Sequence, residues 1–183
     1  MAKQFPGIED GIRDFILRQR IFFVASAAAG SRVNMSPRST DCLRLLGPNR
    51  VAYLDRTGSG NETSAHIRAG GRLTVMFCAF EGPPSILRLY GSGSVHHPGH
   101  ATYDQLLLEQ YDGTAPVGTR QIVTIDLDLV QTSCGFGVPL FEYEGERTAM
   151  DRWAEARGEA ALEAYRRKQN VRSIDGLPSG LFD

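Results

Sequence analysis

The sequence lacks the marks of several common protein classes. Its three cysteines are too few and too widely spaced for a disulfide framework or a zinc ribbon. Basic and acidic residues are nearly balanced, 20 against 21, so no overall charge favours nucleic acid or an anionic membrane. The apolar run at 21–29 is too short to span a bilayer, and the N-terminus spreads charge where a signal peptide would carry its apolar core. We therefore expect a cytoplasmic protein with reduced thiols and with no nucleic-acid or membrane partner.

The remaining composition is that of an ordinary globular domain. The chain has 183 residues, of which 42% are hydrophobic and 22% are charged. This length suits one domain with its own core, and no repeat, low-complexity tract or linker divides the chain. We predict a single domain over residues 1–183.

Apolar periodicity predicts a mainly β protein with flanking helices. One apolar stripe with helical spacing, from Ile8 to Ile16, follows Pro6-Gly7. Strand patterns joined mostly by short turns occupy much of the rest, and they do not alternate with helices as βαβ units would. We therefore expect a mainly antiparallel sheet or barrel. The expected strands are 21–27, 33–38, 42–46, 50–54, 72–80, 86–95 and 120–132, and further helices are expected at 102–110 and 147–168.

Two of these strands should be buried differently. Residues 72–80 (RLTVMFCAF) are apolar on nearly both faces, so this strand should be covered on both sides. In 120–132, the apolar residues Val123, Ile125, Leu127 and Leu129 alternate with polar ones. That alternation predicts a strand with one solvated face.

The stretch DRTGSGNETSAHI at 55–67 raises the question of a phosphate-binding loop. It fails as a dinucleotide fingerprint, because the third glycine of G-x-G-x-x-G is Thr63 here. It fails as a triphosphate loop, because no Gly-Lys-Ser or Gly-Lys-Thr follows. A strand runs into the glycine turn, and Asn61 is a plausible N-cap for a short helix that Gly70-Gly71 would end.

An anion could still bind at this turn. Backbone amides at the helix start, with the hydroxyls of Thr57, Ser59 and Thr63, can satisfy an anion without a lysine. On spacing alone, a plain strand-to-helix turn is the alternative. His66, on the short helix, could approach a ligand or lie on the surface.

Other reactive side chains do not form a recognisable catalytic or metal site. His96, His97 and His100 lack a helical i, i+4 pair and surround Pro98-Gly99, which favours a plain loop. Cys134 has no histidine neighbour in sequence, and burial is the more common fate of a free cysteine. No Ser/His/Asp arrangement stands out. We therefore predict no metal site and assign no catalytic residue.

Six segments, taken in order, resemble a known family. They are VNMSPR (33–38), VAYLDRTGSGNETSAHI (51–67), GRLTVMFCAF (71–80), LRLYGSG (87–93), SCGFGVP (133–139) and NVRSIDGLPSG (170–180). Together they resemble the pyridoxamine 5′-phosphate oxidase-related family of FMN-binding split barrels, and the last two look like a particular branch of it. The resemblance covers essentially the whole chain and rests on ordered blocks rather than on one motif. It implies an antiparallel split β-barrel.

By this resemblance the protein is a homodimer that binds two FMN molecules in clefts between its subunits. The family's first cofactor segment, an extended strand beneath the isoalloxazine ring, falls on Asn34, Met35, Ser36, Pro37 and Arg38. Its phosphate segment falls on the glycine loop. There the resemblance implies contacts from Thr57, Ser59, Gly60 and Asn61.

The sequence departs from the family pattern at the phosphate. The oxidase carries an Arg-Lys pair in this loop, and the corresponding positions here are Gly58 and Ser59. Such a pair matters because charge-assisted hydrogen bonds are about twice as strong as neutral ones. Arg56 or Arg88 could restore the charge. We favour Arg88, because it lies on the strand face that matches the cofactor-contacting glutamine of the oxidase.

The resemblance implies an FMN-dependent oxidoreductase that transfers hydride at the flavin N5 atom to or from an unidentified small molecule. Pyridoxamine phosphate is not assigned as the substrate, because the oxidase's C-terminal substrate-binding pattern is not recognisable in 140–183. Two alternatives stay open: the same fold with a deazaflavin or haem, and a flavin-binding or regulatory module without turnover. The terminal SIDGLPSG (173–180) is too rich in turn residues for a helix, so it should form an ordered loop or a tail over the partner.

Overall fold

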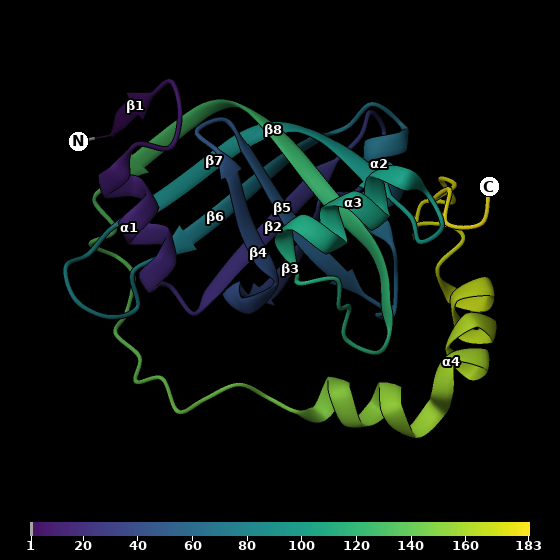
Figure 1. Cartoon of the computed structure of the whole chain (residues 1–183). Coiled ribbons are helices and arrows are strands. Elements are labelled where there is room, and N and C mark those ends of the chain that lie inside the picture. The colour runs from purple at the N-terminus through teal and green to yellow at the C-terminus, as the bar shows by residue number, and fades with distance from the viewer. Residues whose placement is uncertain (1) are drawn as a thin grey trace.

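The computed structural model describes residues 2–183 and shows a curled antiparallel sheet flanked by helices (Figure 1). Seven strands lie in the order β3-β2-β6-β7-β8-β5-β4, and β1 pairs with β8. The strand pairings are antiparallel. The predicted mainly β, antiparallel architecture is therefore confirmed. The strands are β1 (Lys3–Phe5), β2 (Ile21–Ala27), β3 (Asn34–Ser39), β4 (Leu43–Gly47), β5 (Arg50–Arg56), β6 (Arg72–Cys78), β7 (Ile86–His96) and β8 (Thr119–Ser133).

The predicted hairpins form because turn residues separate runs of alternating residues. β2 pairs with β3 across the turn near Gly30, which adopts a φ of 75°. β4 pairs with β5 across Pro48 and Asn49, with a register shift between Leu45 and Gly47. Both hairpins were expected from the sequence, and both are confirmed within one or two residues at their ends.

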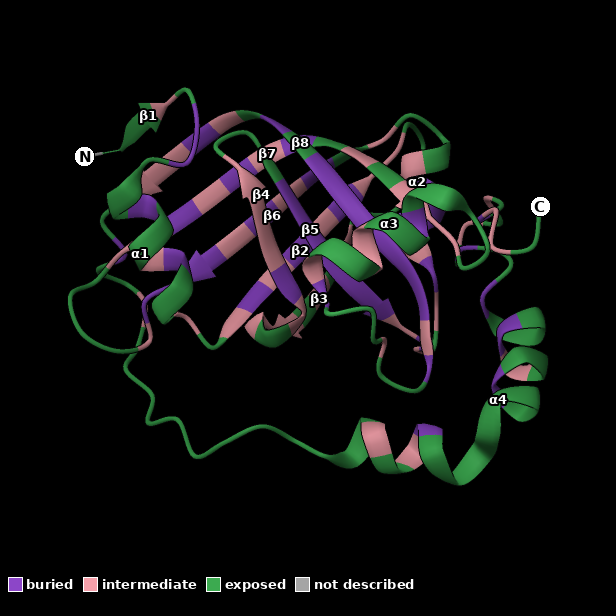
Figure 2. Ribbon diagram, in the orientation of Figure 1, coloured by how far each residue is buried: buried purple, intermediate pink, exposed green. Residues whose placement is uncertain are grey.

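The strands of the curled sheet carry most of the buried residues (Figure 2), and their apolar side chains form a hydrophobic core. Phe22 on β2 stacks with Phe77 on β6 at 5.9 Å between ring centroids and meets the edge of Tyr53 on β5 at 6.0 Å. Each such side chain contributes about 1.5–3 kcal/mol by leaving water. The fully buried core side chains on the strands are Phe22, Val24, Val51, Tyr53, Val75, Phe77, Leu87, Leu89, Val123, Ile125 and Val130.

Strand β8 departs from the expected alternation. A register shift between Tyr90 and Gly91 of β7 leaves an extra residue on β8, so Val130 rather than Leu129 enters the core. The first half of β8 has no solvated face either. Ile122 is buried in a second cluster with Tyr103 and Tyr111, against helix α3. Only Asp126 and Asp128 show the exposure that the pattern predicted for the polar positions.

The helices close the ends and edges of the sheet. Helix α1 (Asp10–Arg18) buries Ile12 and Ile16, as its apolar stripe predicted. Helix α2 (Glu62–Arg68) follows the glycine loop, and α3 (Ala101–Gln110) covers β8. A 3-10 turn, η1 (Thr40–Cys42), joins β3 to β4. Among residues 2–183, no helix is both long and apolar enough to cross a bilayer.

The C-terminal quarter forms an arm outside the sheet (Figure 1). Residues 134–148 leave the end of β8 without regular structure, are mostly exposed, and lead into α4 (Ala149–Gln169). Gly158 breaks this helix into two pieces with a φ of 70° and a ψ of 164°, a conformation that favours glycine. The second piece buries Leu162 and Arg166, and it carries the last residues of the chain back to α2.

Candidate functional site

One face of β3 points into the curled sheet. Ser36 pairs with the buried Val24 and Arg38 pairs with the buried Phe22, so their side chains share the inner side. Asn34 lies on the same side and donates to the Ser36 hydroxyl at 3.3 Å. Met35 points outward and is 60% exposed. The predicted cofactor strand thus presents Asn34, Ser36 and Arg38 on its inner face.

Arg38 reaches across the sheet to Asp55 at the end of β5. Its Nη1 lies 2.6 Å from Asp55 Oδ1, and its guanidinium lies 4.6 Å from the Tyr53 ring centroid. Arg120 on β8 approaches the other carboxylate oxygen, with Nε 2.9 Å from Oδ2. Burial alone would raise the pKa of Asp55, but the positive charges of Arg120 and Arg38 outweigh it and hold the pKa below its ordinary value. The buried Arg120 and the largely buried Arg38 therefore share one carboxylate, which leaves an excess of positive charge.

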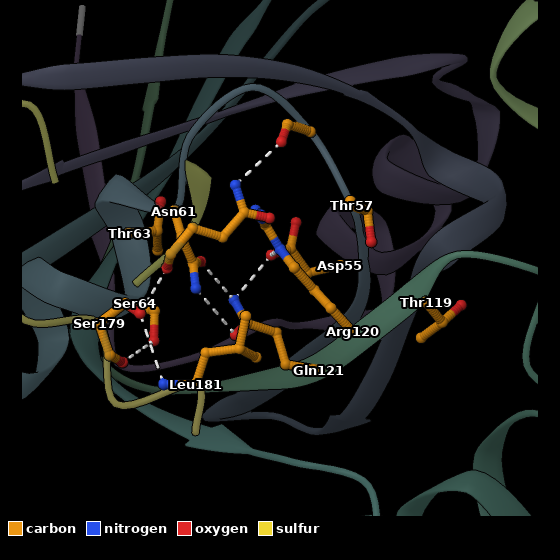
Figure 3. A network of polar contacts seen from close by, with 12 residues as sticks. Asp55, Thr57, Asn61, Thr63, Ser64, Thr119, Arg120, Gln121, Ser179 and Leu181 are labelled. Atoms are coloured by element: carbon orange, nitrogen blue, oxygen red, sulfur yellow. Dashed lines mark hydrogen bonds and ion pairs between the residues drawn. The ribbon is translucent and has the colours of Figure 1, made fainter. Parts of the chain in front are cut away.

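A buried network connects this charge cluster to the glycine loop (Figure 3). Gln121 donates to Asp55 Oδ2 at 2.7 Å and to the Asn61 side-chain oxygen at 2.9 Å. Arg120 Nη1 donates to the Gly60 carbonyl at 2.8 Å. Asp55, Asn61, Arg120 and Gln121 are each at most 5% exposed. The bonds to Gly60 and Asn61 therefore hold the loop from its buried side.

The loop differs from the expected cap. Asn61 precedes α2, but its side chain makes no capping bond and binds Gln121 instead, because the buried glutamine amide needs a partner. The helix ends at Arg68, and Gly70 follows with a φ of 73°, as the Gly70-Gly71 signal predicted. Among residues 2–183, no hydrogen bond is made by the backbone amides of Gly58, Ser59 and Gly60. These donors are available for an anion.

The distant C-terminal region completes the loop's support. Thr57 is buried and donates its hydroxyl to the Gly118 carbonyl at 2.8 Å, while accepting from Arg166 Nε at 2.7 Å. Asn170 accepts from Arg120 Nη1 at 2.8 Å and donates to the Gly58 carbonyl at 3.0 Å. Residues from β8 and from the end of α4 therefore hold both ends of the glycine turn.

A cavity of about 630 Å³ lies where β3, the glycine loop and the C-terminal segment meet. Ligand pockets for small molecules are commonly about 300–1,000 Å³, so its size suits a nucleotide-sized ligand. Asn34, Ser36, Pro37, Arg38, Ser59 and Gly60, all predicted from the sequence, line it together. Its other charged lining residues are Asp55, Arg56, Glu62, Arg120, Lys168 and Arg172.

The charge of this cavity fits an anionic ligand. Its five cationic side chains outnumber its two carboxylates. Within residues 2–183, the buried Nε–H groups of Arg38 and Arg56 have no hydrogen-bond partner. Unpaired buried donors are uncommon and need an acceptor such as a ligand, an ion or water. A phosphate ester such as that of FMN supplies the acceptors that these donors need.

The remaining predicted residues lie outside the cavity lining. Thr57 and Asn61 lie directly beneath the loop, where they support it through the bonds described above. Arg88 lies on the outer face of β7, where it is paired in register with Met76 and donates to the Ser133 hydroxyl at 3.2 Å. Neither the cofactor role of Arg88 nor that of Met35 is tested by this geometry, and both stay predictions.

The other candidate residues occupy structural positions. His66 is 1% exposed rather than on the surface, and its Nδ1 lies 2.9 Å from the Ser26 hydroxyl. His96 ends β7 and contacts the Thr124 hydroxyl at 3.0 Å. Cys134 is exposed rather than buried. In the described part of the chain, no three His, Cys, Asp or Glu side chains gather as metal ligands would.

Comparison with solved structures identifies the fold. The curled antiparallel sheet matches crystal structures of split barrels. HupZ from Group A Streptococcus aligns with 67% of this chain and 91% of its own, at 18% identity and a TM-score of 0.52. A pyridoxamine 5′-phosphate oxidase-related, FMN-binding protein from Nostoc punctiforme aligns with 67% of this chain and 82% of its own, at 12% identity and a TM-score of 0.50. At these identities the likeness establishes the fold, and the predicted split barrel is confirmed.

Sequence comparison identifies the family. The family model for pyridoxamine 5′-phosphate oxidase matches residues 8–134. The pyridoxamine 5′-phosphate oxidase family protein ustO of Aspergillus flavus is 39% identical over 195 aligned residues, which cover 95% of this chain and 76% of the relative. The chain belongs to the pyridoxamine 5′-phosphate oxidase family, as the six sequence segments indicated.

Proposed function

We propose that the protein binds FMN in the cavity between β3 and the glycine loop and acts as an FMN-dependent oxidoreductase. The observation that carries this proposal is the cationic cavity itself, in which two buried arginine Nε–H groups lack partners among the described residues. Family membership and the FMN-binding relative of the same fold support the choice of flavin. When bound, FMN would supply hydride transfer at its N5 atom.

Different residues of this chain would contact different parts of FMN. Arg38, with the free amides of Gly58, Ser59 and Gly60, would bind the phosphate, because charged and backbone donors together suit a dianion. Asn34 and Ser36 would meet the remainder of the cofactor along β3. The Asp55–Arg120–Gln121 network would keep these donors in place without touching the ligand.

The side chains that line the cavity favour a flavin over haem, because few of them could bind haem iron. Haem iron takes a His, Cys, Tyr or Met side chain as its axial ligand. Among the described residues that line the cavity, Met150 is the one side chain of these types. Met150 precedes the Gly158 break, on the exposed first piece of α4. A deazaflavin cofactor also carries a phosphate on its ribityl chain, and mass separates it from FMN directly.

We further propose a homodimer in which the outer face of β2, β6 and β7 meets a second copy. Phe23, Met76 and Arg88 lie side by side on that face, in register. They are only half-buried in the single chain. Apolar groups with an arginine among them are typical of the fully buried centre of protein interfaces. Arg88 would then lie at the cofactor cleft between the subunits, on the strand face that matches the cofactor-contacting glutamine of the oxidase.

Titration of FMN into flavin-free protein tests the function. We expect flavin fluorescence to change on binding, and we expect the bound flavin to be reduced by a nicotinamide nucleotide and reoxidised by an added electron acceptor. Binding without turnover under any donor tried would favour a flavin-binding module instead. Failure to bind FMN would contradict the proposal.

A further inference from the structure

The C-terminal segment is built into the glycine loop through buried polar contacts. Asn170 is fully buried, and its side-chain amide joins Arg120 at 2.8 Å to the Gly58 carbonyl at 3.0 Å. An asparagine suits this position because it accepts from the guanidinium and donates to the carbonyl at once. The end of α4 therefore takes part in shaping a loop that lies 112 positions earlier in the sequence.

The residues after Asn170 are also hydrogen-bonded to α2. Ser64 on α2 donates to the Ser179 carbonyl at 2.7 Å (Figure 3). Ser179 in turn donates its hydroxyl to the Asn170 carbonyl at 2.6 Å. The Glu62 carboxylate accepts from the Ile174 backbone amide at 3.0 Å. Ordinary hydrogen bonds of this kind contribute about 0.5–1.5 kcal/mol each, and the buried Arg120–Asn170 bond adds a charge-assisted one. The segment is thus held on its own chain, at the wall of the cavity.

This placement brings two further cations to the cavity. Lys168 and Arg172, on either side of Asn170, both line it. Arg172 donates to the Gly176 carbonyl at 2.8 Å, a neutral acceptor that leaves its charge uncancelled. By contrast, Arg38 and Arg120 share the Asp55 carboxylate, and Arg56 pairs with Asp151 at 2.6 Å. Among the described residues, Lys168 and Arg172 form no ion pair, so the C-terminal segment adds their charge to the excess that Arg38 and Arg120 leave beside Asp55.

We propose that the C-terminal segment 168–179 forms the cationic wall of the phosphate site. Lys168 and Arg172 bind the phosphate and take the place of the cations that the glycine loop lacks, while Asn170 is a positioning residue that sets the loop's shape. For the identity of the phosphate ester as FMN, this inference rests on the proposed function. The phosphate role of the two cations does not depend on the flavin ring.

The test compares FMN with riboflavin, which has the same ring and no phosphate. The double variant Lys168→Gln/Arg172→Gln should weaken FMN binding by about tenfold or more and leave riboflavin binding unchanged, since only the phosphate contact is removed. Arg167→Gln is the matched control. It removes one charge from the same helix, pairs with the exposed Glu163 at 2.6 Å, and does not line the cavity.

Asn170→Ala should also weaken FMN binding, because Arg120 and the Gly58 carbonyl lose their shared partner. Folding of each variant is checked by its melting temperature. If Asn170→Ala does not fold, the proposal is tested by the double variant, whose substituted residues Lys168 and Arg172 are exposed. A folded Asn170→Ala protein with wild-type FMN affinity would remove Asn170 from its positioning role.

The outcomes separate this inference from the proposed function. Unchanged FMN affinity in the double variant, or an equal loss for riboflavin, overturns the phosphate role while FMN binding by the wild type stands. If the wild type binds no FMN, the function is contradicted, and inorganic phosphate becomes the probe. If phosphate stabilises the wild type and Arg167→Gln against heat but not the double variant, the phosphate role of Lys168 and Arg172 is still supported. Stabilisation that persists in the double variant, or is absent from the wild type, overturns it.

Discussion

Arg38 and Asp55 join two strands that are not neighbours in the sheet. Nη1 of Arg38 on β3 lies 2.6 Å from Oδ1 of Asp55 on β5, although four strands separate β3 from β5 in the sheet order. The contact links the two sides of the curled sheet directly beside the glycine loop. Because Arg120 binds the same carboxylate, Asp55 is the residue on which the candidate site depends most.

Replacing Asp55 should therefore destabilise the protein strongly. Asp55→Asn keeps the shape but leaves the buried guanidiniums of Arg38 and Arg120 without a counter-charge. Removing one partner of a buried ion pair costs about 3–5 kcal/mol, and we expect a loss of that size in the free energy of unfolding, measured by urea titration. Asp126→Asn is the control, because its ion pair with Arg50 is exposed and should contribute less than about 1 kcal/mol. Equal effects of the two variants would contradict the assignment.

The same residue predicts a pH dependence of stability. The pKa of Asp55 is held below its ordinary value of 3.8, so its contribution is complete above that value. As the pH falls from there through the lower folded-state pKa, the carboxylate is protonated and the contribution is lost. The difference in unfolding free energy between wild type and Asp55→Asn should thus be largest near neutral pH and should shrink below about pH 3.8. A difference that is constant across the acid range would argue against the ion pair.

Two glycines near the site should differ in how far their replacement by alanine destabilises the protein. A Cβ at Gly71 would press against the Ala27 carbonyl and lie 2.7 Å from the His66 carbonyl, so α2 would have to move away from β2. A Cβ at Gly58 would meet nothing within 4 Å. We expect Gly71→Ala to lower the unfolding free energy by about 2 kcal/mol or more and Gly58→Ala to change it by less than about 0.5 kcal/mol. Thermal denaturation of the two variants side by side checks this order.

The proposed dimer makes Arg88 a further test. Light scattering after gel filtration should give twice the chain mass of 20.1 kDa. Within a dimer that shares its sites, Arg88→Ala should weaken FMN binding by about tenfold, the effect of one lost charge-assisted contact. Tyr90→Phe is a control on the same face of β7, because it keeps the ring and removes only the hydroxyl that donates to Gln131 at 3.4 Å. A monomer, or a dimer whose Arg88→Ala variant keeps full flavin affinity, would remove Arg88 from the site.

The fold follows largely from local signals, because hairpins and helices form between residues that are close in sequence. The strands of both early hairpins, α1 and α3 were predicted within one or two residues at most ends. The register shift that brings Val130 into the core was not predicted, because it depends on how β7 pairs with β8. The break at Gly158 was also missed, since an isolated glycine in a helical pattern is usually tolerated.

The site was predictable only in part. The inner face of β3 and the glycine loop were found through their resemblance to family segments, and the structure places them around one cavity. Arg120, Arg166 and Asn170 were missed, because they lie 50 or more positions from the residues they bind and no local spacing marks the pairing. One signal was present. Arg120 and Gln121 are polar residues at the start of an apolar strand, and buried charge needs a partner such as Asp55.

The central claim is that this cavity holds FMN by its phosphate. Mass spectrometry of the small molecule released when the purified protein is denatured tests the claim most directly. The account predicts FMN, in a ratio approaching one per chain, and its loss from a folded Lys168→Gln/Arg172→Gln variant during purification. Release of haem or a deazaflavin, or a colourless protein that takes up no added FMN, would contradict it.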